Sequence, residues 1–202
     1  MIHICQGYSL ADARLASMFR DRKTLFVDLL GWEVPVIDGQ FEIDRYDGAD
    51  ALYLIAADDD GHHMGSMRLL PTEAGHLLAD LFPDLCACEI PRGPHVMEIT
   101  RLCLPQRLGS AGRQWVRNRL ISAMVDHALG RGVTLLSGVV TAPYREQVLA
   151  MGWRAAALGP PIVRDSAALG AFRLHIDAET PARLAANGIY SPGMIVPAAQ
   201  AA

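Results

Sequence analysis

Arginine and carboxylate side chains of this sequence follow a pattern that could form an anion-binding ion network. Arg68 lies inside an apolar run, where a guanidinium is costly to bury unless it meets an anion. Carboxylates flank it in the chain, in the motif Glu42-x-Asp44-x-x-Asp47 on one side and at Glu98 on the other. The alternatives are a surface position for Arg68 on a half-exposed strand and a solvated loop for the three preceding carboxylates.

Four further residues could take part in the same chemistry. Arg22 and Phe26 are four residues apart in a helical pattern and therefore share a face, and Trp32 follows shortly after them. Arg101 stands three residues after Glu98 in a strand pattern. Because side chains three apart on a strand point to opposite faces, these two can face one pocket only if the strand bends or bulges.

Two groups of side chains raise the question of a metal, and we expect none. His62 and His63 follow three aspartates at 58–60, but the ligand types are mixed without a recognisable spacing. We therefore interpret this segment as a hydrophilic hairpin tip. The four cysteines also lack zinc-ligand spacing and are interpreted as mostly buried thiols of a reducing compartment. They are Cys5, Cys86, Cys88 and Cys103.

A glycine-containing turn, Gln106–Gly112, opens a long amphipathic helix pattern that ends near Leu129. The exposed N–H groups of such a helix start suit a phosphate, although a plain loop-to-helix junction is equally compatible with the pattern. Positive side chains in the first turns either add to this charge or form a solvated helix face. They are Arg113, Arg117 and Arg119.

The hydrophobic pattern predicts the helices and strands that position these residues. Strand patterns cover residues 51–57, 64–70, 96–104, 133–141 and 171–176. Helix patterns cover residues 10–30, as one helix or as two that meet near the charged run at 20–23, and also residues 72–82, 113–129, 143–151 and a short segment from Thr180. The first two strands predict an antiparallel hairpin. Gly31 is the expected C-cap of the first helix, and Thr72 is the expected N-cap of the second.

This order of elements predicts a single α/β domain with helices on both faces of a twisted mixed sheet. The domain is expected to span residues 1–190, followed by a flexible tail at 191–202 that is rich in proline and alanine. With 202 residues, of which 51% are hydrophobic, the chain is long enough for one well-buried core.

Composition also limits the function and the compartment. The formal net charge of -4 argues against a general nucleic-acid binder, which needs a concentrated excess of positive charge. We find no signal-peptide pattern and no apolar run of membrane-spanning length. We therefore expect a cytoplasmic protein that binds neither nucleic acid nor membrane.

Four motifs, in their order and spacing, together resemble the acyl-homoserine-lactone synthases, the autoinducer synthases of bacterial quorum sensing. The motifs are Arg22-x3-Phe26-x5-Trp32, Glu42-x-Asp44-x2-Asp47, Arg68-Leu-Leu-Pro-Thr72 and Glu98-x2-Arg101. Each motif alone is weak, but the ordered combination is specific and extends over most of the chain. The resemblance implies a GNAT-like fold, in which the mixed sheet is flanked by helices and two splayed strands form a cleft.

The same resemblance implies an acyltransferase with two substrates and no cofactor. S-adenosylmethionine is consumed as a substrate, and the acyl group arrives as a thioester, on acyl carrier protein or on coenzyme A. The α-amine of S-adenosylmethionine attacks the thioester. Its carboxylate then closes on the γ-carbon, which forms the lactone and releases 5′-methylthioadenosine.

The acyl donor is open between these two carriers. The turn Gln106-x2-Gly109-x-Ala111 resembles the pyrophosphate-binding loop of GNAT acetyltransferases, which raises the chance of an acyl-CoA donor. The arginines of the following helix suit either donor, because acyl carrier protein is acidic and coenzyme A is phosphorylated.

The resemblance also implies roles for the polar residues. Glu98 is the expected general base, with Asp44 as the alternative and as a ligand of the substrate ammonium. Arg68 and Arg101 are expected to hold the substrate carboxylate, a group that arginine binds through two parallel hydrogen bonds. The expected structural partners that hold the N-terminal segment over the site are Arg22, Glu42 and Asp47.

Apolar residues are expected to recognise the remaining parts of the substrates. Phe26 and Trp32 are expected to form an aromatic wall at the adenosyl or sulfonium group, with core packing as the alternative for Phe26. The acyl chain is expected to enter a pocket between the long helix and the strand at 133–141. Its candidate lining residues, for which core packing is again the alternative, are Leu120, Met124, Val139, Thr141, Leu149 and Trp153. Thr100 and Leu102 stand where many members have serine and an aromatic residue, and could alter the acyl fit.

Two other functions are compatible with the sequence. One is a GNAT N-acyltransferase that uses acyl-CoA and an amine other than S-adenosylmethionine, without lactone formation. The other is a non-catalytic relative that binds adenosyl compounds. Release of methylthioadenosine separates both from the synthase.

Overall fold

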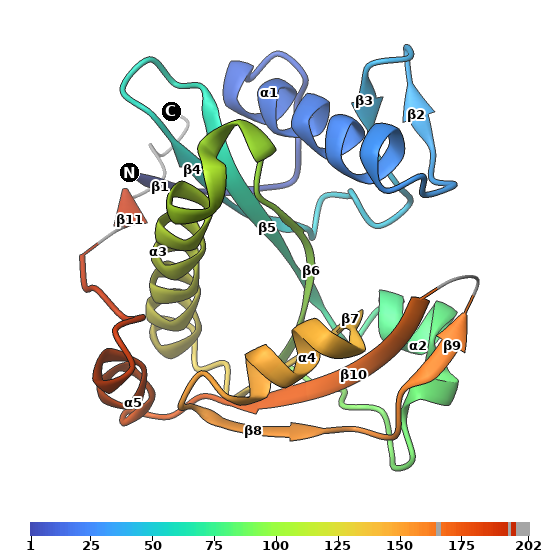
Figure 1. Ribbon diagram of the computed structural model, residues 1–202, viewed down its shortest axis with the longest axis vertical. Coiled ribbons are helices and arrows are strands. Elements are labelled where there is room, and N and C mark those ends of the chain that lie inside the picture. The colour runs from blue at the N-terminus through green and yellow to red at the C-terminus, as the bar shows by residue number, and fades with distance from the viewer. Residues whose placement is uncertain (165–166, 194, 197–202) are drawn as a thin grey trace. The chain divides into compact units, whose positions relative to one another are not determined.

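The structure is a computed structural model that describes residues 1–164, 167–193 and 195–196 (Figure 1). The chain forms two compact units. The first comprises Met1–Leu69, Arg101–Ala123 and the described part of Pro192–Ala202, and the second comprises Leu70–Thr100 and Met124–Ser191. Among the described residues, no helix is both long and apolar enough to cross a membrane.

The strands of the first unit pair in the order β11-β1-β4-β5. Strand β1 (Ile2–Gln6) runs antiparallel to β4 (Leu52–Ala57), which in turn pairs antiparallel with β5 (His63–Pro71). The predicted hairpin is therefore confirmed, and its register places Tyr53 opposite Arg68. Every residue of β4 is buried, as its continuous apolar pattern predicts.

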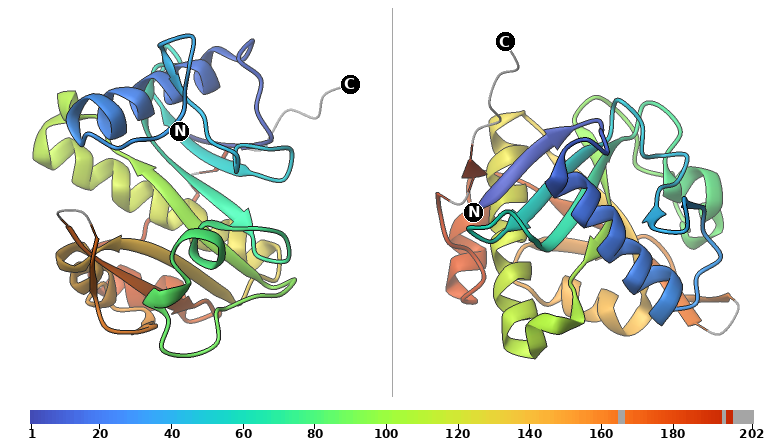
Figure 2. Two further views of the ribbon diagram at one scale, coloured as in Figure 1. Left: turned by 90° about the vertical axis from the view of Figure 1, so that its right-hand side faces the viewer. Right: turned by 90° about the horizontal axis from the view of Figure 1, so that it is seen from above.

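The first helical segment begins at α1 (Ala13–Arg22), where the Asp12 carboxylate caps the N-terminus by accepting the N–H groups of Arg14 and Leu15. The chain then continues as a π-helix, Lys23–Leu29, and ends before Gly31, whose φ of 68° fits the predicted cap. The apolar face of α1 packs against β3 (Phe41–Glu42) and β4 (Figure 2). The helix is confirmed, but its change to π winding is not visible in the apolar spacing.

The polar segment after this helix contains a short hairpin that the sequence does not predict. Strand β2 (Val36–Ile37) pairs antiparallel with β3, so that Glu42 lies in a strand. Two-residue strands give too short an alternation to be recognised in a polar stretch. The hairpin fixes the backbone of Glu42, which a loop would leave free.

In the second unit the strands pair in the order β6-β7-β10-β8, and β9 (Ile162–Arg164) also pairs with β10. Residues Val96–Ile99 of β6 (Val96–Cys103) run parallel to β7 (Leu135–Thr141). Strand β10 (Ala167–His175) is antiparallel to β7 and to β8 (Arg154–Ala157). The sheet is therefore mixed, as predicted.

Helices of the second unit cover this sheet. Helix α4 (Ala142–Leu149) packs against β7, β8 and β10, as Figure 1 shows, and α5 (Thr180–Ala186) follows β10. Helix α2 (Leu77–Leu81) is shorter than predicted and is followed by a 3-10 turn at Pro83–Leu85. Below it lies an apolar cluster of Leu78, Leu85, Leu158 and Ala171.

The predicted cap of α2 is wrong. His76 occupies the N-cap position. The Thr72 hydroxyl instead bonds to the start of β6 and the turn before it: it donates to the Val96 carbonyl at 3.0 Å and accepts from the Gly93 N–H at 3.1 Å. The reason is that β5 continues through Pro71, so the chain is still extended where the sequence suggests a helix start.

The longest helix, α3 (Gly109–Gly130), begins within the predicted glycine turn, and Gly109 has a φ of 64°. Its predicted apolar stripe is confirmed, because Val116, Leu120, Met124 and Ala128 are all buried. Of the predicted tail, 194 and 197–202 lie outside the described residues. Within it, β11 (Ile195–Val196) pairs parallel with β1.

Candidate active site

Three arginines and three carboxylates of the first unit form one ion network. They come from α1, β3, β5, the segment 44–47 and the end of β6, and their formal charges cancel. The six are Arg22, Glu42, Asp44, Asp47, Arg68 and Arg101. The alternatives of a surface position for Arg68 and a solvated loop for Glu42, Asp44 and Asp47 are therefore wrong, since no side chain of the network is more than 8% exposed.

Arg22 connects α1 to the acidic motif. Its Nε donates to Glu42, and its two terminal nitrogens each donate to one oxygen of Asp47 at 2.9 Å. The guanidinium is 1% exposed, so this fork-to-fork pairing is out of water. Burial acts to lower the pKa of Arg22, but the charges of Asp47 and Glu42 raise it above its ordinary value.

Arg68 lies at the centre of the network. It donates to both oxygens of Asp44, at 2.7 and 3.0 Å, and its guanidinium lies 2.7 Å from the Asp47 carboxylate. The side chain is fully buried on β5, next to the strand that carries Tyr53. Arg68 is thus an internal cation held by two carboxylates.

Asp47 also has partners other than arginine. In addition to the two arginines, it accepts the Tyr53 hydroxyl at 2.8 Å and the Asp44 N–H at 2.8 Å. Burial acts to raise the pKa of the Asp47 carboxyl, but Arg22 and Arg68 hold it well below its usual range. Burial and the neighbouring Asp47 charge raise the pKa of Tyr53, so its hydroxyl stays protonated and continues to donate.

Arg101 joins the network where β6 bends. Its backbone φ is 50°, a left-handed value that interrupts the alternation of side chains along the strand. The bend that the spacing of Glu98 and Arg101 requires therefore exists. Its guanidinium donates to Glu42 at 2.9 Å and lies 2.7 Å from Asp44. With exposures of 7% and 8%, Arg101 and Asp44 are the two members of the network that reach solvent.

Phe26 and Trp32 form the predicted aromatic pair. Their rings stack with centroids 4.7 Å apart and an interplanar angle of 15°. The Arg101 guanidinium lies 5.5 Å from the Phe26 ring and 5.7 Å from the Trp32 ring, within cation–π distance of both. Phe26 is buried, whereas 44% of Trp32 is exposed beside the network. The pair therefore presents one open aromatic surface.

Glu98 belongs to the second unit and has a structural task that the sequence does not reveal. Its two oxygens accept the backbone N–H groups of Leu77 and Leu78 at 2.7 and 2.8 Å, so this carboxylate stabilises the start of α2. The side chain is fully buried. The two N–H groups lie 21 and 20 residues away in sequence, and no local signal predicts these contacts. Its role as general base stays a prediction.

The predicted acyl-pocket residues differ in their surroundings. Leu120, Met124 and Trp153 are buried, and the Trp153 indole N–H donates to the Val148 carbonyl at 2.7 Å. Thr141 is exposed at the end of β7. Within the second unit, Val139 packs against the apolar cluster, together with five other partly buried side chains that the sequence does not single out for the acyl pocket. These are Phe82, Cys86, Ile90, Ile162 and Leu169.

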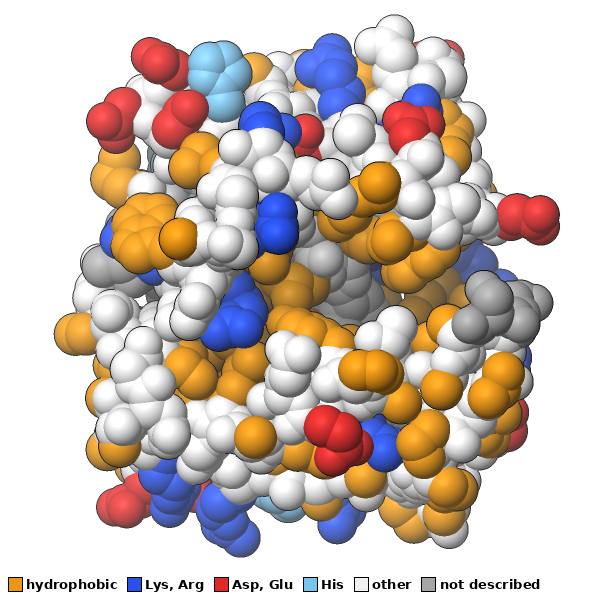
Figure 3. Space-filling model, viewed as in Figure 1, with side chains coloured by type: hydrophobic (Ala, Val, Ile, Leu, Met, Phe, Trp, Pro, Cys, Tyr) orange, Lys and Arg blue, Asp and Glu red, His pale blue; other side chains and the backbone are white. Residues whose placement is uncertain are grey.

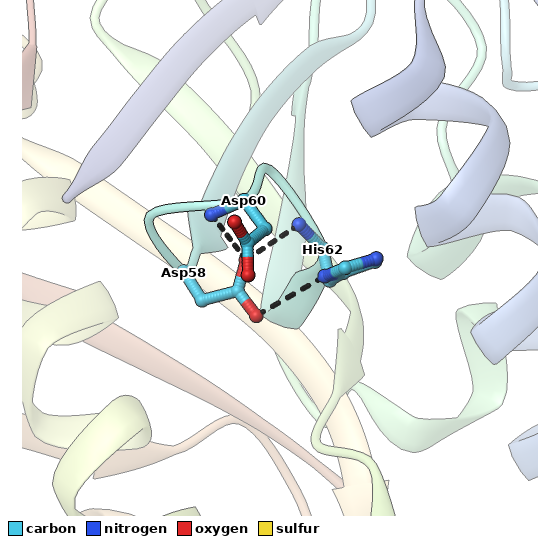
Figure 4. Close-up of side chains that lie close together, drawn as sticks. All are labelled: Asp58, Asp60 and His62. Atoms are coloured by element: carbon cyan, nitrogen blue, oxygen red, sulfur yellow. Dashed lines mark hydrogen bonds and ion pairs between the residues drawn. The ribbon is translucent and has the colours of Figure 1, made fainter.

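The hairpin tip between β4 and β5 matches its predicted character except at one residue. Asp58 accepts the backbone N–H groups of Asp60 and His62, and its carboxylate lies 3.3 Å from the His62 ring (Figure 4). All three side chains are exposed, and acidic groups and a histidine are visible together at this tip in Figure 3. The contacts among them serve the turn, and our prediction that no metal binds here stays a prediction.

His63 is the exception, because it is fully buried and its ring nitrogen Nδ1 lies 2.6 Å from Asp21. Arg107 completes this second cluster by donating to both oxygens of Asp21, at 2.8 and 2.7 Å. Burial acts to raise the pKa of Asp21, but the stronger opposite effects of His63 and Arg107 lower it to about 2. No local pattern in the sequence predicts this cluster, because its members are 42 and 86 residues apart.

The first turns of α3 carry positive charge and an exposed tryptophan. Trp115 is 55% exposed, and the Arg119 guanidinium lies 4.4 Å from its ring centroid. Arg113 donates to the Gln106 carbonyl, and Arg117 to the side-chain oxygen of Asn118. Among the described residues, none of these three arginines forms an ion pair with a carboxylate. Lys and Arg side chains are seen over this face in Figure 3.

The sequence comparisons agree with one another. Residues 7–184 match the autoinducer synthase family. The acyl-homoserine-lactone synthase of Ralstonia nicotianae is 34% identical over 187 residues, which cover 90% of this chain and 92% of the relative. That of Rhizobium etli is 38% identical over 144 residues, which cover 68% of this chain and 66% of the relative.

Solved structures show the same fold. The CoA-dependent acyl-homoserine lactone synthase BjaI, with MTA, has a TM-score of 0.85 at 25% identity, with 97% of this chain and 92% of BjaI covered. TofI, in a ternary complex with an inhibitor and MTA, has a TM-score of 0.77 at 30% identity, with 96% and 99% covered. A putative N-acetyltransferase from Lactobacillus plantarum shares the fold with a TM-score of 0.61 at 19% identity. The predicted GNAT-like α/β fold is confirmed, while the splayed cleft stays a prediction. This chain belongs to the autoinducer synthase family.

Proposed function

We propose that the protein synthesises an acyl-homoserine lactone from S-adenosylmethionine and an acyl-CoA thioester. The observation that carries the proposal is the charge-balanced network, of which only Asp44 and Arg101 reach solvent. The methionyl end of S-adenosylmethionine presents one ammonium and one carboxylate. A carboxylate and a guanidinium side by side match these two groups, and binding a zwitterion adds no uncompensated charge to the network.

In this proposal Asp44 receives the ammonium and Arg101 receives the carboxylate. Arg68 lies behind Asp44 and fixes its orientation through two hydrogen bonds. Arg22 and Asp47 hold α1 against the acidic motif and touch no substrate. A rigid arrangement of this kind keeps the amine and the carboxylate of the substrate in fixed directions, which both bond-forming steps require.

The aromatic pair supports recognition of the rest of the substrate. The Trp32 ring is open to solvent, and Arg101 already lies over the stack at cation–π distance. A sulfonium or an adenine ring could occupy the open aromatic surface. Two of the similar solved structures contain MTA, the nucleoside that remains after lactone formation.

The chemistry proceeds in two displacements. The ammonium first loses a proton, and the free amine attacks the thioester carbonyl, which forms an amide and expels the thiol. A carboxylate oxygen then attacks the γ-carbon, and the sulfonium leaves with the bonding electron pair as a thioether. Glu98 is our candidate for the proton acceptor, and Asp44 is the alternative.

Four observations favour coenzyme A as the carrier of the acyl group. The turn that opens α3 supplies backbone N–H groups, and the arginines of its first turns have no carboxylate partner among the described residues. Trp115 adds an exposed ring on which a base could stack. BjaI, in a structure with SAM and isopentyl-CoA, and MesI are CoA-dependent relatives with TM-scores of 0.85 and 0.81.

The proposal is tested by incubating the purified protein with S-adenosylmethionine and matched panels of acyl-CoA and acyl-carrier-protein thioesters. Mass spectrometry of the products should show an acyl-homoserine lactone and 5′-methylthioadenosine in equal amounts, formed faster from acyl-CoA. An acyl amide without lactone or methylthioadenosine would rule out the synthase activity. Faster turnover of the carrier-protein thioesters would rule out the proposed donor alone.

A further inference from the structure

The helix that begins at Ala13 changes its winding directly after Arg22. The segment Lys23–Leu29 is a π-helix, and the Leu30 N–H donates to the Leu25 carbonyl, five residues back, at 3.1 Å. π-helices are rare and appear mostly as single turns inside α-helices, frequently at functional sites. A seven-residue π segment therefore calls for an additional stabilising contact.

One ion pair in this segment fits π winding and not α winding. The Lys23 ammonium donates to both oxygens of Asp28, at 2.7 and 2.9 Å. In an α-helix, residues five apart are separated by roughly 140° around the axis, and ion pairs form between residues three or four apart. The wider π turn brings positions 23 and 28 onto one face. Both side chains remain partly exposed, at 27% and 47%.

The winding of this segment decides where Phe26 points. Arg22 is fixed by the ion network at one end, and the chain is closed at the other end by the Trp32 N–H, which donates to the Phe26 carbonyl at 2.8 Å. Between these anchors, a change from π to α winding would rotate Phe26 about the helix axis. It would then leave the stack with Trp32 and its position beside Arg101.

We propose that the Lys23–Asp28 pair is a positioning ion pair, which holds this segment in the π register and so sets Phe26 against Trp32 at the substrate site. The inference rests on the proposed function only for the identity of the ligand, S-adenosylmethionine. Neither charged side chain is assigned contact with a substrate.

The test moves the negative charge from the fifth residue after Lys23 to the fourth. Val27→Glu combined with Asp28→Asn places the acid where it pairs with Lys23 in an α-helix. Thr24→Glu combined with Asp28→Asn is the matched control, since it has the same net charge but adjacent side chains that do not face each other. Lys23→Asp combined with Asp28→Lys reverses the pair and preserves its spacing.

Two measurements are made on each variant: exchange of the Trp32 backbone amide in the free protein, and the dissociation constant for S-adenosylmethionine by calorimetry. In the variant that combines Val27→Glu with Asp28→Asn, the Trp32 amide should exchange faster than in the parent protein. This variant should also bind S-adenosylmethionine about threefold to tenfold more weakly. The reversed pair should stay within about twofold of the parent, and the control should lie between them.

The inference is overturned if the Val27→Glu variant keeps the parental exchange rate and affinity, or if the reversed pair is impaired as strongly as that variant. If amide exchange follows the expected order but the parent protein does not bind S-adenosylmethionine, the positioning role stands and the proposed function fails.

Discussion

Substitution of Asp47 by asparagine should unbalance the ion network with almost no change in shape. The side chain keeps its size, and the Tyr53 hydroxyl can still donate to the amide oxygen. The variant, however, leaves three buried guanidiniums facing two carboxylates. It also turns one hydrogen-bond acceptor of Arg22 into an N–H donor, so two donors then face each other.

The size of the effect follows from the burial of these groups. Removing one partner of a buried ion pair costs about 3–5 kcal/mol, because the remaining charge stays out of water without compensation. Both side chains of the Arg22–Asp47 pair are at most 1% exposed, so solvent screening does not reduce this cost. For a slope of about 2–3 kcal/mol per molar urea, the unfolding midpoint should fall by about 1 to 2.5 M.

Urea unfolding, followed by circular dichroism at pH 7, measures this shift. Asp50→Asn is the matched control, since it removes the same charge from an exposed position in the same segment and should change stability by less than about 0.5 kcal/mol. Arg22→Met combined with Asp47→Asn restores the balance of charge. The double variant should cost at least about 1 kcal/mol less than the sum of the two single variants.

Two results would refute the reasoning. A loss below about 1 kcal/mol for Asp47→Asn would mean that the network tolerates an uncompensated charge. Strict additivity of Arg22→Met and Asp47→Asn would mean that the two side chains do not stabilise each other, whatever their distance.

Three further outcomes are expected. Burial lowers the pKa of His63, so the unfolded chain takes up a proton near pH 6.5 that the folded protein resists. Stability should therefore be lost as the pH falls from about 6.5, and a His63→Asn variant should show a shallower decrease of its melting temperature between pH 7 and 5. Gly138→Ala should lower the free energy of unfolding by about 1–3 kcal/mol, since its Cβ would lie 2.7 Å from the Phe172 ring. Gly130→Ala is the control: its Cβ would have nothing within 4 Å, so thermal melts should show no change in stability. Trp32→Ala should raise the KM for S-adenosylmethionine about tenfold with little change in melting temperature, because 44% of its surface is exposed; an unchanged KM would remove it from the site.

The elements that the sequence predicts well are those whose signal is local and long. The stripe from Val116 to Ala128 repeats over several turns, and the β4–β5 hairpin has apolar strands on both sides of a polar turn. The order of the charged motifs also predicts which side chains belong together. The sequence does not show which carboxylate pairs with which arginine, because contacts such as that of Arg101 with Glu42 join residues 59 positions apart.

Other features could not be predicted because they depend on the folded environment. The alternation rule assumes regular strand geometry at Arg101, and the positive φ that interrupts it there is a property of one residue. Glu98 stabilises α2 across 21 residues, so its carboxylate looks free in the sequence. The π winding after Arg22 leaves no trace in the apolar spacing, since it shifts hydrogen bonds by only one residue.

The six-residue ion network carries no net charge, and this has a consequence for how the binding of each proposed substrate depends on salt concentration. Mobile ions screen exposed charges over about 10 Å at 0.1 M ionic strength, but they act little on opposite charges that are paired out of water. In the proposed function the methionyl end binds at Asp44 and Arg101, and this binding should therefore be nearly independent of ionic strength. Capture of a phosphorylated donor by the arginines of α3 should weaken steadily as salt is added. One enzyme would then sense the ionic strength of its surroundings through one of its two substrates only.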